Sequence, residues 1–313
     1  MPDKISVVIP CRNEEKFIKK CLDSVVSQNY PKENLEVLVV DGASQDRTRE
    51  IIQRYSENYP FIKLLYNPRK FVPIALNIGI KNSQGDIIVR MDSHAVYDKE
   101  YISKSVYYLK KYNADNAGGP VKTVPFKKTL MAEAIALALS HPFGVGGACF
   151  RKGVKKVREA DTVFGGCFRK EIFEKIGFFN ENLTSGSEDM EFNLRLKKQG
   201  GKIILAPDII SYYYPKSDLK SFFFHNIRDG VWAILPLKFV KMPLRLRHYI
   251  PLVFVLTLPL SFWPYILVSF YFSLRIAIAE RTFSYLFIMP LVFAARHIGY
   301  GLGSLWGLVR LLF

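Results

Sequence analysis

The sequence predicts an α/β domain built around a mostly parallel sheet, followed by an apolar, helical C-terminal segment. Short β-branched runs alternate with amphipathic helical segments from Ile5 to Asp92, which is typical of βαβ units. No charged residue occurs between Tyr249 and Leu274, although the chain of 313 residues has a net charge of +16. Because 49% of the residues are hydrophobic and 14% are aromatic, most of the chain is expected to fold rather than to be disordered.

The N-terminal half contains four predicted strands and three predicted helices. The strands are expected at residues 5–10, 35–42, 62–66 and 86–92, and the helices at 14–28, 46–55 and 72–81. Asp46 is the expected N-cap of the second helix. Ligands of parallel sheets bind beyond the carboxyl ends of the strands. Polar residues follow three of these strands, at Cys11–Glu14, Asp41–Asp46 and Asp92–His94, so we expect a binding site there.

Several classes of protein are disfavoured by missing patterns. The four cysteines form no CxxC pair, so a disulfide scaffold or a cysteine zinc site is not expected, and buried free thiols are. No GxGxxG or Walker motif follows the first strand. Neither a zinc-finger nor an RNP pattern is present, so no nucleic-acid partner is expected. The first apolar run is too short for a secretory signal, so the chain is expected to begin in the cytosol.

A series of motifs between residues 5 and 215 resembles glycosyltransferase family 2, the inverting nucleotide-sugar transferases with a GT-A (Rossmann-like) fold. The motifs are VVIPCRNEE, VLVVDGASQDRT, NPRKFVPIALNIGI, GDIIVRMDSHA and FGGCFRKEIFEKIGFFNENLTSGSEDMEFNLRLKKQG. The MDSHA form, the ADTVFGG stretch and the apolar tail look most like the membrane-bound succinoglycan-type glucosyltransferases and the transferases of lipid-linked glycan assembly.

The resemblance implies a site for a nucleoside diphosphate sugar, most often a UDP-sugar, with a GDP-sugar as the alternative. It places residues of the first three motifs, together with Asp92, around this donor. These are Pro10, Asn13, Glu14, Asp41, Arg69, Asn77 and Asp92, with Asp46 less directly involved. A turn or a helix cap is the structural alternative for Asp41 and Asp46.

The resemblance also implies a metal site at Asp92 and His94. The family's usual motif is Asp-x-Asp, and here the second position is His94. A carboxylate and an imidazole can bind the same cation, and imidazole suits Mn²⁺ better than Mg²⁺. We therefore expect Mn²⁺ or Mg²⁺ as the cofactor, with a structural histidine as the alternative.

An inverting transfer needs a general base for the acceptor hydroxyl. The pair Glu188-Asp189 matches the family's Glu-Asp motif, in which the aspartate is the base, and Glu188 is expected to position it. Two acids at a helix start are also explained by the helix dipole alone. Three further features are weaker candidates for sugar or acceptor contacts: Asp161, Gly165-Gly166, and the glycine-rich loop His141–Gly153.

The predicted domains are a GT-A domain at residues 1–230, a basic interfacial segment at 231–248 and membrane helices at 249–313. The first span is expected at Tyr249–Leu274, where Pro259 and Pro264 also allow a re-entrant hairpin. The second is expected at Thr282–Val309, which contains Arg296.

Two features near these spans suggest how they are placed. Glycines at 299, 303 and 307 are expected to pack this second span against the first. Five cations lie between residues 228 and 248: Arg228, Lys238, Lys241, Arg245 and Arg247. They are expected to contact a lipid diphosphate of the acceptor or the donor, or else to flank the span. Cations on this side of the span place the catalytic domain on the cytoplasmic side of the cell membrane, against membrane lipids.

The function predicted from these features is metal-dependent transfer of a hexose to a polyprenyl-linked saccharide. Direct transfer to polyprenyl phosphate is the alternative within the same class. A non-catalytic membrane scaffold that keeps a transferase fold is the alternative from another class. A processive synthase is disfavoured, because the sequence contains no Gln-x-x-Arg-Trp motif.

Overall fold

The computed structural model describes residues 2–184, 186–240 and 246–312. The chain divides into two compact units that alternate along the sequence. The sheet unit comprises Met1–Val121 and Gly153–Tyr213, and the helical unit comprises Lys122–Lys152 and Tyr214–Phe313. The predicted domain limits were consecutive, whereas here residues 122–152 join the C-terminal helices because the apolar helix within them packs there. As a functional division, the predicted limits remain a prediction.

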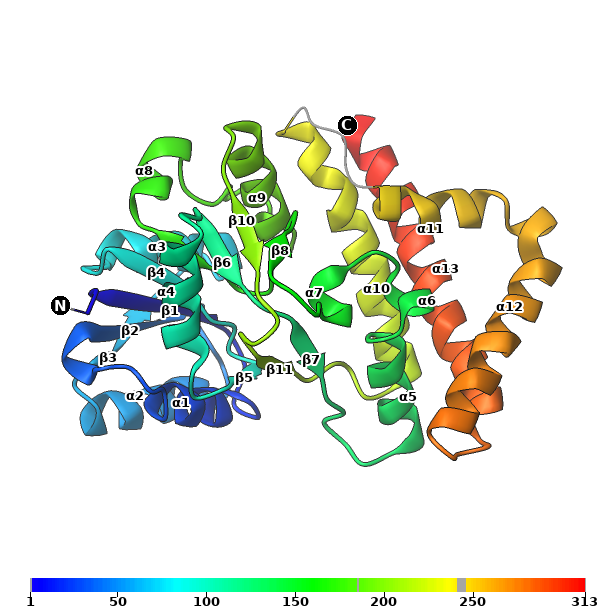
Figure 1. Cartoon of the computed structure of the whole chain (residues 1–313), viewed down its shortest axis with the longest axis horizontal. Coiled ribbons are helices and arrows are strands. Elements are labelled where there is room, and N and C mark those ends of the chain that lie inside the picture. The colour runs from blue at the N-terminus through cyan, green and yellow to red at the C-terminus, as the bar shows by residue number, and fades with distance from the viewer. Residues whose placement is uncertain (1, 185, 241–245, 313) are drawn as a thin grey trace. The chain divides into compact units, whose positions relative to one another are not determined.

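The main sheet of the sheet unit has eight strands in the order β3-β2-β1-β4-β9-β6-β10-β8 (Figure 1). The strands are β1 (Ile5–Cys11), β2 (Leu35–Asp41), β3 (Ile62–Tyr66), β4 (Ile87–Arg90), β6 (Asn116–Gly118), β8 (Arg158–Glu159), β9 (Cys167–Arg169) and β10 (Ile203–Leu205). The four predicted strands form its parallel half. The rest is mixed, because β9 runs antiparallel to both of its neighbours.

A second, smaller sheet has the order β5-β11-β7. Its strands are β5 (Ala95–Tyr97), β7 (Val121–Thr123) and β11 (Ser211–Tyr213). Strand β5 begins three residues after Asp92 and pairs antiparallel with β11, so the segment that carries Asp92 and His94 is anchored at both ends by strands.

Helices cover the main sheet and close the hydrophobic core around β1 and β2. They are α1 (Ile18–Val26), η1 (Lys32–Asn34), α2 (Thr48–Asn58), α3 (Val72–Asn82), α4 (Tyr101–Lys111), α8 (Glu171–Ile176) and α9 (Glu188–Lys198). Every residue of β1 and β2 is buried, as expected for central strands covered on both faces. The prediction of Asp46 as the N-cap of α2 is wrong in detail: the N-cap is Arg47. Asp46 instead accepts hydrogen bonds from the backbone N–H groups of Thr48 and Glu15.

The helical unit consists of helices alone apart from its share of β7. They are α5 (Leu130–Ala138), α6 (Pro142–Val145), α7 (Cys149–Lys152), α10 (Leu219–Ile234), η2 (Leu235–Lys238), α11 (Leu246–Leu256), α12 (Leu258–Ala279) and α13 (Tyr285–Leu312). The predicted interfacial segment after residue 230 is partly internal to this unit, because Val231, Ile234, Leu235 and Val240 are buried. Lys241 and Arg245 lie outside the described residues.

The glycine-rich stretch His141–Gly153, expected as a loop, is largely helical, and its contact with the acceptor stays a prediction. It forms α6 and α7, and Phe143 packs against Phe272 and Phe293 with ring centroids 4.8 Å apart in both pairs. The packing of this aromatic side chain explains the difference, because it offsets the cost of ordering the glycines.

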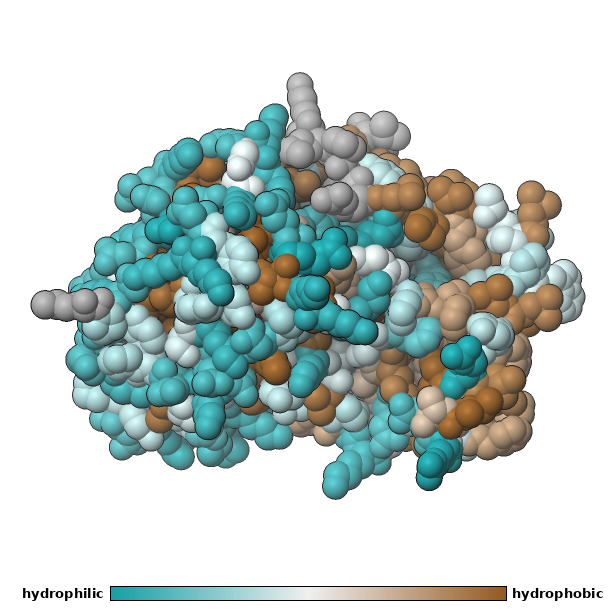
Figure 2. All heavy atoms as spheres, in the orientation of Figure 1, coloured by the Kyte–Doolittle hydropathy of each residue, from teal (hydrophilic) through white to brown (hydrophobic). Residues whose placement is uncertain are grey.

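The first predicted span is divided into two helices. Helix α11 ends at Leu256 and α12 begins at Leu258. Helices α12 and α13 are each long and apolar enough to cross a membrane, judged by length and composition. Large apolar side chains are exposed along α11 and α12, where hydrophobic residues gather in Figure 2; Leu260 is 86% and Trp263 is 73% exposed. Such a surface is typical of contact with lipid.

The glycine stripe of α13 packs against a different helix from the one predicted. A Cβ at Gly303 would lie 2.0 Å from the carbonyl oxygen of Ile227, and one at Gly307 would lie 2.8 Å from that of Val231. Both partners belong to α10, whose backbone approaches α13 too closely for any side chain. The expected packing against the first span is met only by Gly301, which faces Pro251 of α11.

Candidate active site

The predicted donor residues gather at the carboxyl ends of neighbouring parallel strands. Cys11 at the end of β1 pairs with Asp41 at the end of β2, and Val8 of β1 pairs with Arg90 at the end of β4. The loops after β1, β2 and β4 therefore leave the sheet at one edge, as the order of the strands requires.

The loops after β1 and β2 are held together by side chains predicted at the nucleotide. Asn13 has a left-handed φ of 55°; its N–H donates to Ser44 Oγ at 2.9 Å, and its Oδ1 accepts from the N–H of Gln45 at 2.8 Å. The N–H of Glu14 donates to Thr48 Oγ1 at 2.7 Å. Pro10 is buried within β1. These contacts give Asn13 a defined structural role at the predicted nucleotide edge.

Asp41 and Asp46 lie in the same loop but differ in burial. Asp41 is 1% exposed, and both of its carboxylate oxygens accept from the N–H of Ser44 at 3.3 Å. Partial burial would raise the pKa of Asp46, but its hydrogen bonds with Thr48 and Glu15 lower that pKa overall. Both carboxylates are thus preorganised by backbone amides.

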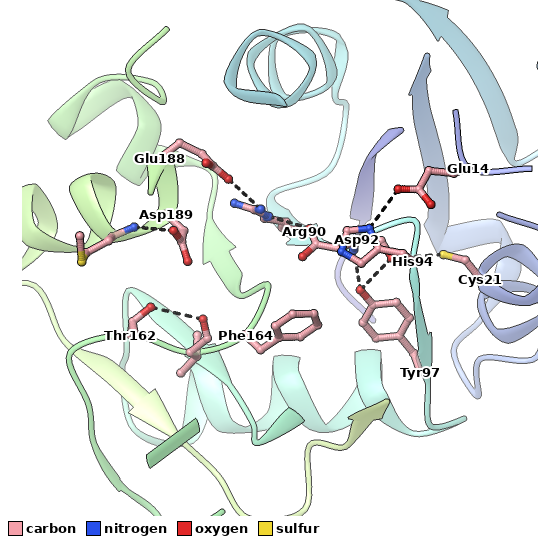
Figure 3. Close-up of polar contacts among 12 residues, drawn as sticks. Glu14, Cys21, Arg90, Asp92, His94, Tyr97, Thr162, Phe164, Glu188 and Asp189 are labelled. Carbon is pink, nitrogen blue, oxygen red and sulfur yellow. Dashed lines mark hydrogen bonds and ion pairs between the residues drawn. The ribbon is translucent and has the colours of Figure 1, made fainter. Parts of the chain in front are cut away.

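His94 and Asp92 lie together beyond β4, as predicted. His94 Nδ1 is 3.2 Å from Glu14 Oε1, and its ring meets the edge of Tyr213 at 5.6 Å between centroids. A carboxylate on Nδ1 orients an imidazole so that Nε2 is turned to a ligand. Glu14, predicted near the base, is therefore joined to the predicted metal pair (Figure 3).

The backbone of Asp92 is fixed by two buried side chains. Its N–H donates to Tyr97 Oη at 2.5 Å, and the thiol of Cys21 donates to its carbonyl oxygen at 3.6 Å. Burial raises the pKa of the Cys21 thiol well above its ordinary value, and Asp92 adds to this shift. The thiol is thus kept protonated as a donor. All four cysteines are free and three are buried, as predicted.

The sequence prediction missed Arg90, which joins the two acidic parts of the site. Its Nε donates to Asp92 Oδ1 at 3.1 Å, and its Nη2 lies 2.8 Å from Glu188 Oε1. In Figure 3 its guanidinium lies between Glu188 and Asp92. A single arginine two residues before an aspartate carries no sequence signal of its own. Its partner Glu188 becomes visible only in the folded chain.

The electrostatics of this cluster follow from burial and from Arg90. Burial alone would raise the pKa of Asp92, but the charges of Arg90 and His94 lower it overall, so Asp92 stays ionised. Burial raises the pKa of Glu188, and Asp189 adds to this shift, while Arg90 opposes it. The pKa values of Asp92 and Glu188, the two partners of Arg90, are thus moved in opposite directions, which is typical of functional sites.

The predicted base lies at the first turn of α9. Ser187, the N-cap residue, has a left-handed φ of 62°. Glu188 is 5% exposed, whereas Asp189 is half-buried and accepts from the N–H of Met190 at 2.8 Å. The strained turn thus directs Glu188 inward to Arg90 and leaves Asp189 the more accessible acid.

Arg69 and Asn77 form a separate cluster around Glu181. Arg69 Nη1 lies 2.7 Å from Glu181 Oε2, and Asn77 Nδ2 donates to Glu181 Oε1 at 3.1 Å. The amide of Asn77 also exchanges hydrogen bonds with the backbone of Phe179. These hydrogen bonds to the loop before α9 account for the burial of Asn77. The binding of the nucleotide sugar by Asn77 remains a prediction.

The glycine pair after β8 packs against the main sheet. Gly165 and Gly166 both have positive φ, and a Cβ on Gly165 would lie 2.7 Å from the carbonyl oxygen of Arg90. Gly166 accepts from the N–H of Arg90 at 2.9 Å. What the glycines permit is thus a close approach to the backbone of Arg90. Asp161, the weaker candidate, is half-buried in the preceding loop.

Asp92 and His94 suit a cation that is also bound by the substrate, rather than a metal site made of protein ligands alone. No group of three His, Cys, Asp or Glu side chains converges as a metal site in the part of the chain that the structure describes. One carboxylate and one imidazole fit a cation that also takes oxygens from a diphosphate and water. Arg228, a predicted acceptor contact, belongs to α10 of the helical unit, where it is paired with His225.

Comparison with known proteins identifies the family. Residues 6–177 match the sequence profile described as "Glycosyl transferase family 2", so the chain belongs to this family and is a glycosyltransferase.

Two curated relatives agree with this assignment. One from Methanococcus voltae, named "dolichyl N-acetyl-alpha-D-glucosaminyl phosphate 3-beta-D-2,3-diacetamido-2,3-dideoxy-beta-D-glucuronosyltransferase", is 32% identical over 72% of this chain and 71% of its own. The succinoglycan biosynthesis protein ExoA of Rhizobium meliloti is 29% identical over 74% of each chain. The predicted resemblance to the succinoglycan-type and lipid-linked glycan transferases is confirmed.

Solved structures confirm the GT-A fold. The mannosyltransferase PcManGT of Pyrobaculum calidifontis, in complex with GDP-Man and Mn²⁺, superposes with a TM-score of 0.67 at 19% identity and covers 98% of this chain and 88% of its own. TarS of Staphylococcus aureus in complex with UDP-GlcNAc has a TM-score of 0.56 at 18% identity, with 96% of this chain and 90% of its own covered.

Proposed function

We propose that the protein transfers a hexose, with inversion, from a nucleoside diphosphate sugar to a polyprenyl-linked saccharide at the cytoplasmic face of the membrane. The observation that carries this proposal is the continuous chain of contacts at one sheet edge. It runs from Glu14 to His94 and Asp92, and from Asp92 through Arg90 to Glu188, next to Asp189. Such an arrangement would put the two residues that bind the cation, Asp92 and His94, and the acid pair Glu188-Asp189 on either side of the reacting centre.

The donor is proposed to lie over the loops after β1, β2 and β4. Amide-bound Asp41, with the Asn13 loop beside it, suits the base and ribose. Asp92 Oδ2, which is outside the Arg90 contact, and His94 would hold Mn²⁺ or Mg²⁺ against the diphosphate. When bound, the cation offsets charge on the leaving diphosphate. Asp189 would take the proton of the acceptor hydroxyl.

The lipid-linked acceptor is supported by the helical unit and by the relatives' names. Helices α12 and α13 are apolar enough to cross a membrane, and the name of the relative from Methanococcus voltae gives a dolichyl N-acetyl-alpha-D-glucosaminyl phosphate, a lipid-linked saccharide. A re-entrant hairpin at Tyr249–Leu274, the alternative to a full crossing, would support the same proposal. Direct transfer to polyprenyl phosphate is the second candidate, since this acceptor also carries a lipid chain that would suit the apolar surface of the helical unit.

Donor hydrolysis by detergent-purified protein tests the proposal. A panel of UDP- and GDP-sugars is incubated with and without Mn²⁺, and release of nucleoside diphosphate is measured for the unsubstituted protein and for His94→Ala. We expect one donor to be hydrolysed only with Mn²⁺, and His94→Ala to lose this activity.

The same assay supplies a control and an overturning result. Arg158→Ala, an exposed change in the sheet unit, should keep the activity. The proposed function would be overturned if no donor bound in calorimetry with Mn²⁺ and none was turned over in the presence of a membrane lipid extract.

A further inference from the structure

The most unusual group in the sheet unit is the buried guanidinium of Arg90. Its side chain is 11% exposed, and the two carboxylates that it meets are 15% and 6% exposed. Its third nitrogen, Nη1, is buried and finds no hydrogen-bond partner among the described residues. An unsatisfied buried donor costs free energy, so stability alone does not account for this arrangement.

The backbone of Arg90 is held as firmly as its side chain. Its N–H donates to Gly166, and the absence of a side chain on Gly165 lets that loop approach its carbonyl oxygen. The neighbouring residue pair, Val89 and Cys167, closes the antiparallel ladder between β4 and β9. The main chain of strand β4 therefore fixes the position of Arg90, and the two acids bind to its guanidinium.

The two acids come from elements that are far apart in sequence. Asp92 follows β4, whereas Glu188 opens α9. Two buried carboxylates repel each other unless a positive charge, here the guanidinium of Arg90, lies between them. A guanidinium can bind both at once through separate N–H groups, which the single ammonium of a lysine does less well.

Resting on the proposed function, we propose that Arg90 is the positioning residue of the transfer site, which sets the place of the cation-binding Asp92 relative to the catalytic pair. Nε holds Asp92 Oδ1 so that Oδ2 is turned to the cation, and Nη2 holds Glu188 so that Asp189 is turned to the acceptor. Donor loading and the base are thus connected through one side chain. Arg90 itself touches neither the cation nor the proton that moves.

A double-substitution experiment tests this connection by binding rather than by turnover. Binding of nucleoside diphosphate to the full chain in detergent is measured by calorimetry with Mn²⁺, for the unsubstituted protein, Arg90→Met, Glu188→Gln and the double variant. Loss of a residue that orients a metal ligand costs about 10- to 100-fold in affinity, so we expect Arg90→Met to weaken binding by that factor. Glu188→Gln alone leaves Arg90 Nε on Asp92, so it should weaken binding less than Arg90→Met does.

The double variant decides between positioning and mere structure. Removing the charge of Glu188 relieves its repulsion of Asp92, so Arg90→Met with Glu188→Gln should recover about tenfold of the lost affinity. Arg90→Lys should fall between the unsubstituted protein and Arg90→Met. Arg169→Met is the matched control, because Arg169 lies on the adjacent strand β9 and contacts only Asn113 and Ala114 among its described hydrogen bonds.

The outcomes separate this inference from the function on which it rests. If Arg90→Met unfolds the protein, Arg90→Lys keeps the charge, and its coupling to Glu188→Gln is read in the same way. Mn²⁺-dependent binding and sugar transfer by the unsubstituted protein, with strictly additive effects in the double variant, would overturn the role of Arg90 alone. Absence of Mn²⁺-dependent binding by the unsubstituted protein would overturn both.

Discussion

Both units contain an arginine whose side chain is largely buried, Arg90 at 11% and Arg296 at 15% exposed, and the two have different partners. Arg90 in the sheet unit lies between two carboxylates, at 3.1 and 2.8 Å. Arg296 in α13 of the helical unit bonds to neutral oxygens, the side-chain carbonyl of Asn226 and the backbone carbonyl of Gly144. The nearest carboxylate, that of Asp229, is 3.8 Å away.

This difference indicates different uses of buried charge. Asp92 beside Arg90 stays ionised, whereas burial raises the pKa of Glu188, and such opposite shifts are typical of a reacting site. Neutral oxygens around Arg296 satisfy its donors in apolar surroundings and tie α13 to α10 and α6, which is how polar groups are accommodated near lipid. We therefore infer that Arg90 serves the function of the sheet unit and that Arg296 serves the assembly of the helical unit.

The largest effect is expected from Asp189→Asn, which tests the functional side of this comparison. With a saccharide acceptor, turnover should fall by about 10²- to 10⁴-fold, because the hydroxyl loses its general base. Donor binding should be unchanged. With polyprenyl phosphate, already ionised, the fall should be small. Glu174→Gln, on the exposed side of α8, is the control, and full activity of Asp189→Asn with a saccharide would remove Asp189 from the proposed role.

Arg296→Met should destabilise the helical unit and leave nucleotide binding intact. Asn226 and Gly144 would each lose a donor, at a combined cost of roughly 2 to 4 kcal/mol. Thermal unfolding in detergent, followed by circular dichroism, measures this loss. Arg275→Met on the exposed side of α12 should have little effect. Reduced donor affinity in Arg296→Met at temperatures where it is folded would contradict the division of roles.

Gly303→Ala should weaken the contact between α13 and α10. The added Cβ would lie 2.0 Å from the carbonyl oxygen of Ile227, so the helices must separate, at a cost of about 1–3 kcal/mol. Gly147→Ala is the control, because nothing lies within 4 Å of its Cβ position. Equal unfolding temperatures for the two variants would show that the close approach is dispensable.

The smallest effect concerns acid stability in the sheet unit. The pKa of Asp46 is lowered in the folded state, so its carboxylate stabilises the fold above the ordinary pKa of 3.8, and this contribution is lost as the pH falls. Asp46→Asn should lower the unfolding temperature at pH 7, and the difference should shrink toward pH 3. Exposed Glu33→Gln should show no such trend. A difference that is constant across this range would exclude the charge as its cause.

The sequence alone determined the parallel half of the sheet, the strand ends that carry Asp41 and Asp92, the apolar C-terminal helices and the family. These features are local in the sequence. A strand that is buried on both faces consists of a continuous apolar run, and the polar residues at its end follow it directly in the chain. The start of α9 at Glu188 is equally local, because acids favour a helix N-terminus.

Only the tertiary structure decided which of these residues meet. Arg90 finds Glu188 across a long separation in sequence, Asn77 is engaged by the loop at Phe179, and the glycines of α13 turn to α10 rather than to the first apolar helix. No periodicity encodes such pairs, because they depend on the three-dimensional course of the chain between them. The helical form of His141–Gly153 has the same origin, since this glycine-rich segment is ordered where the partly buried Phe143 packs against side chains of α12 and α13.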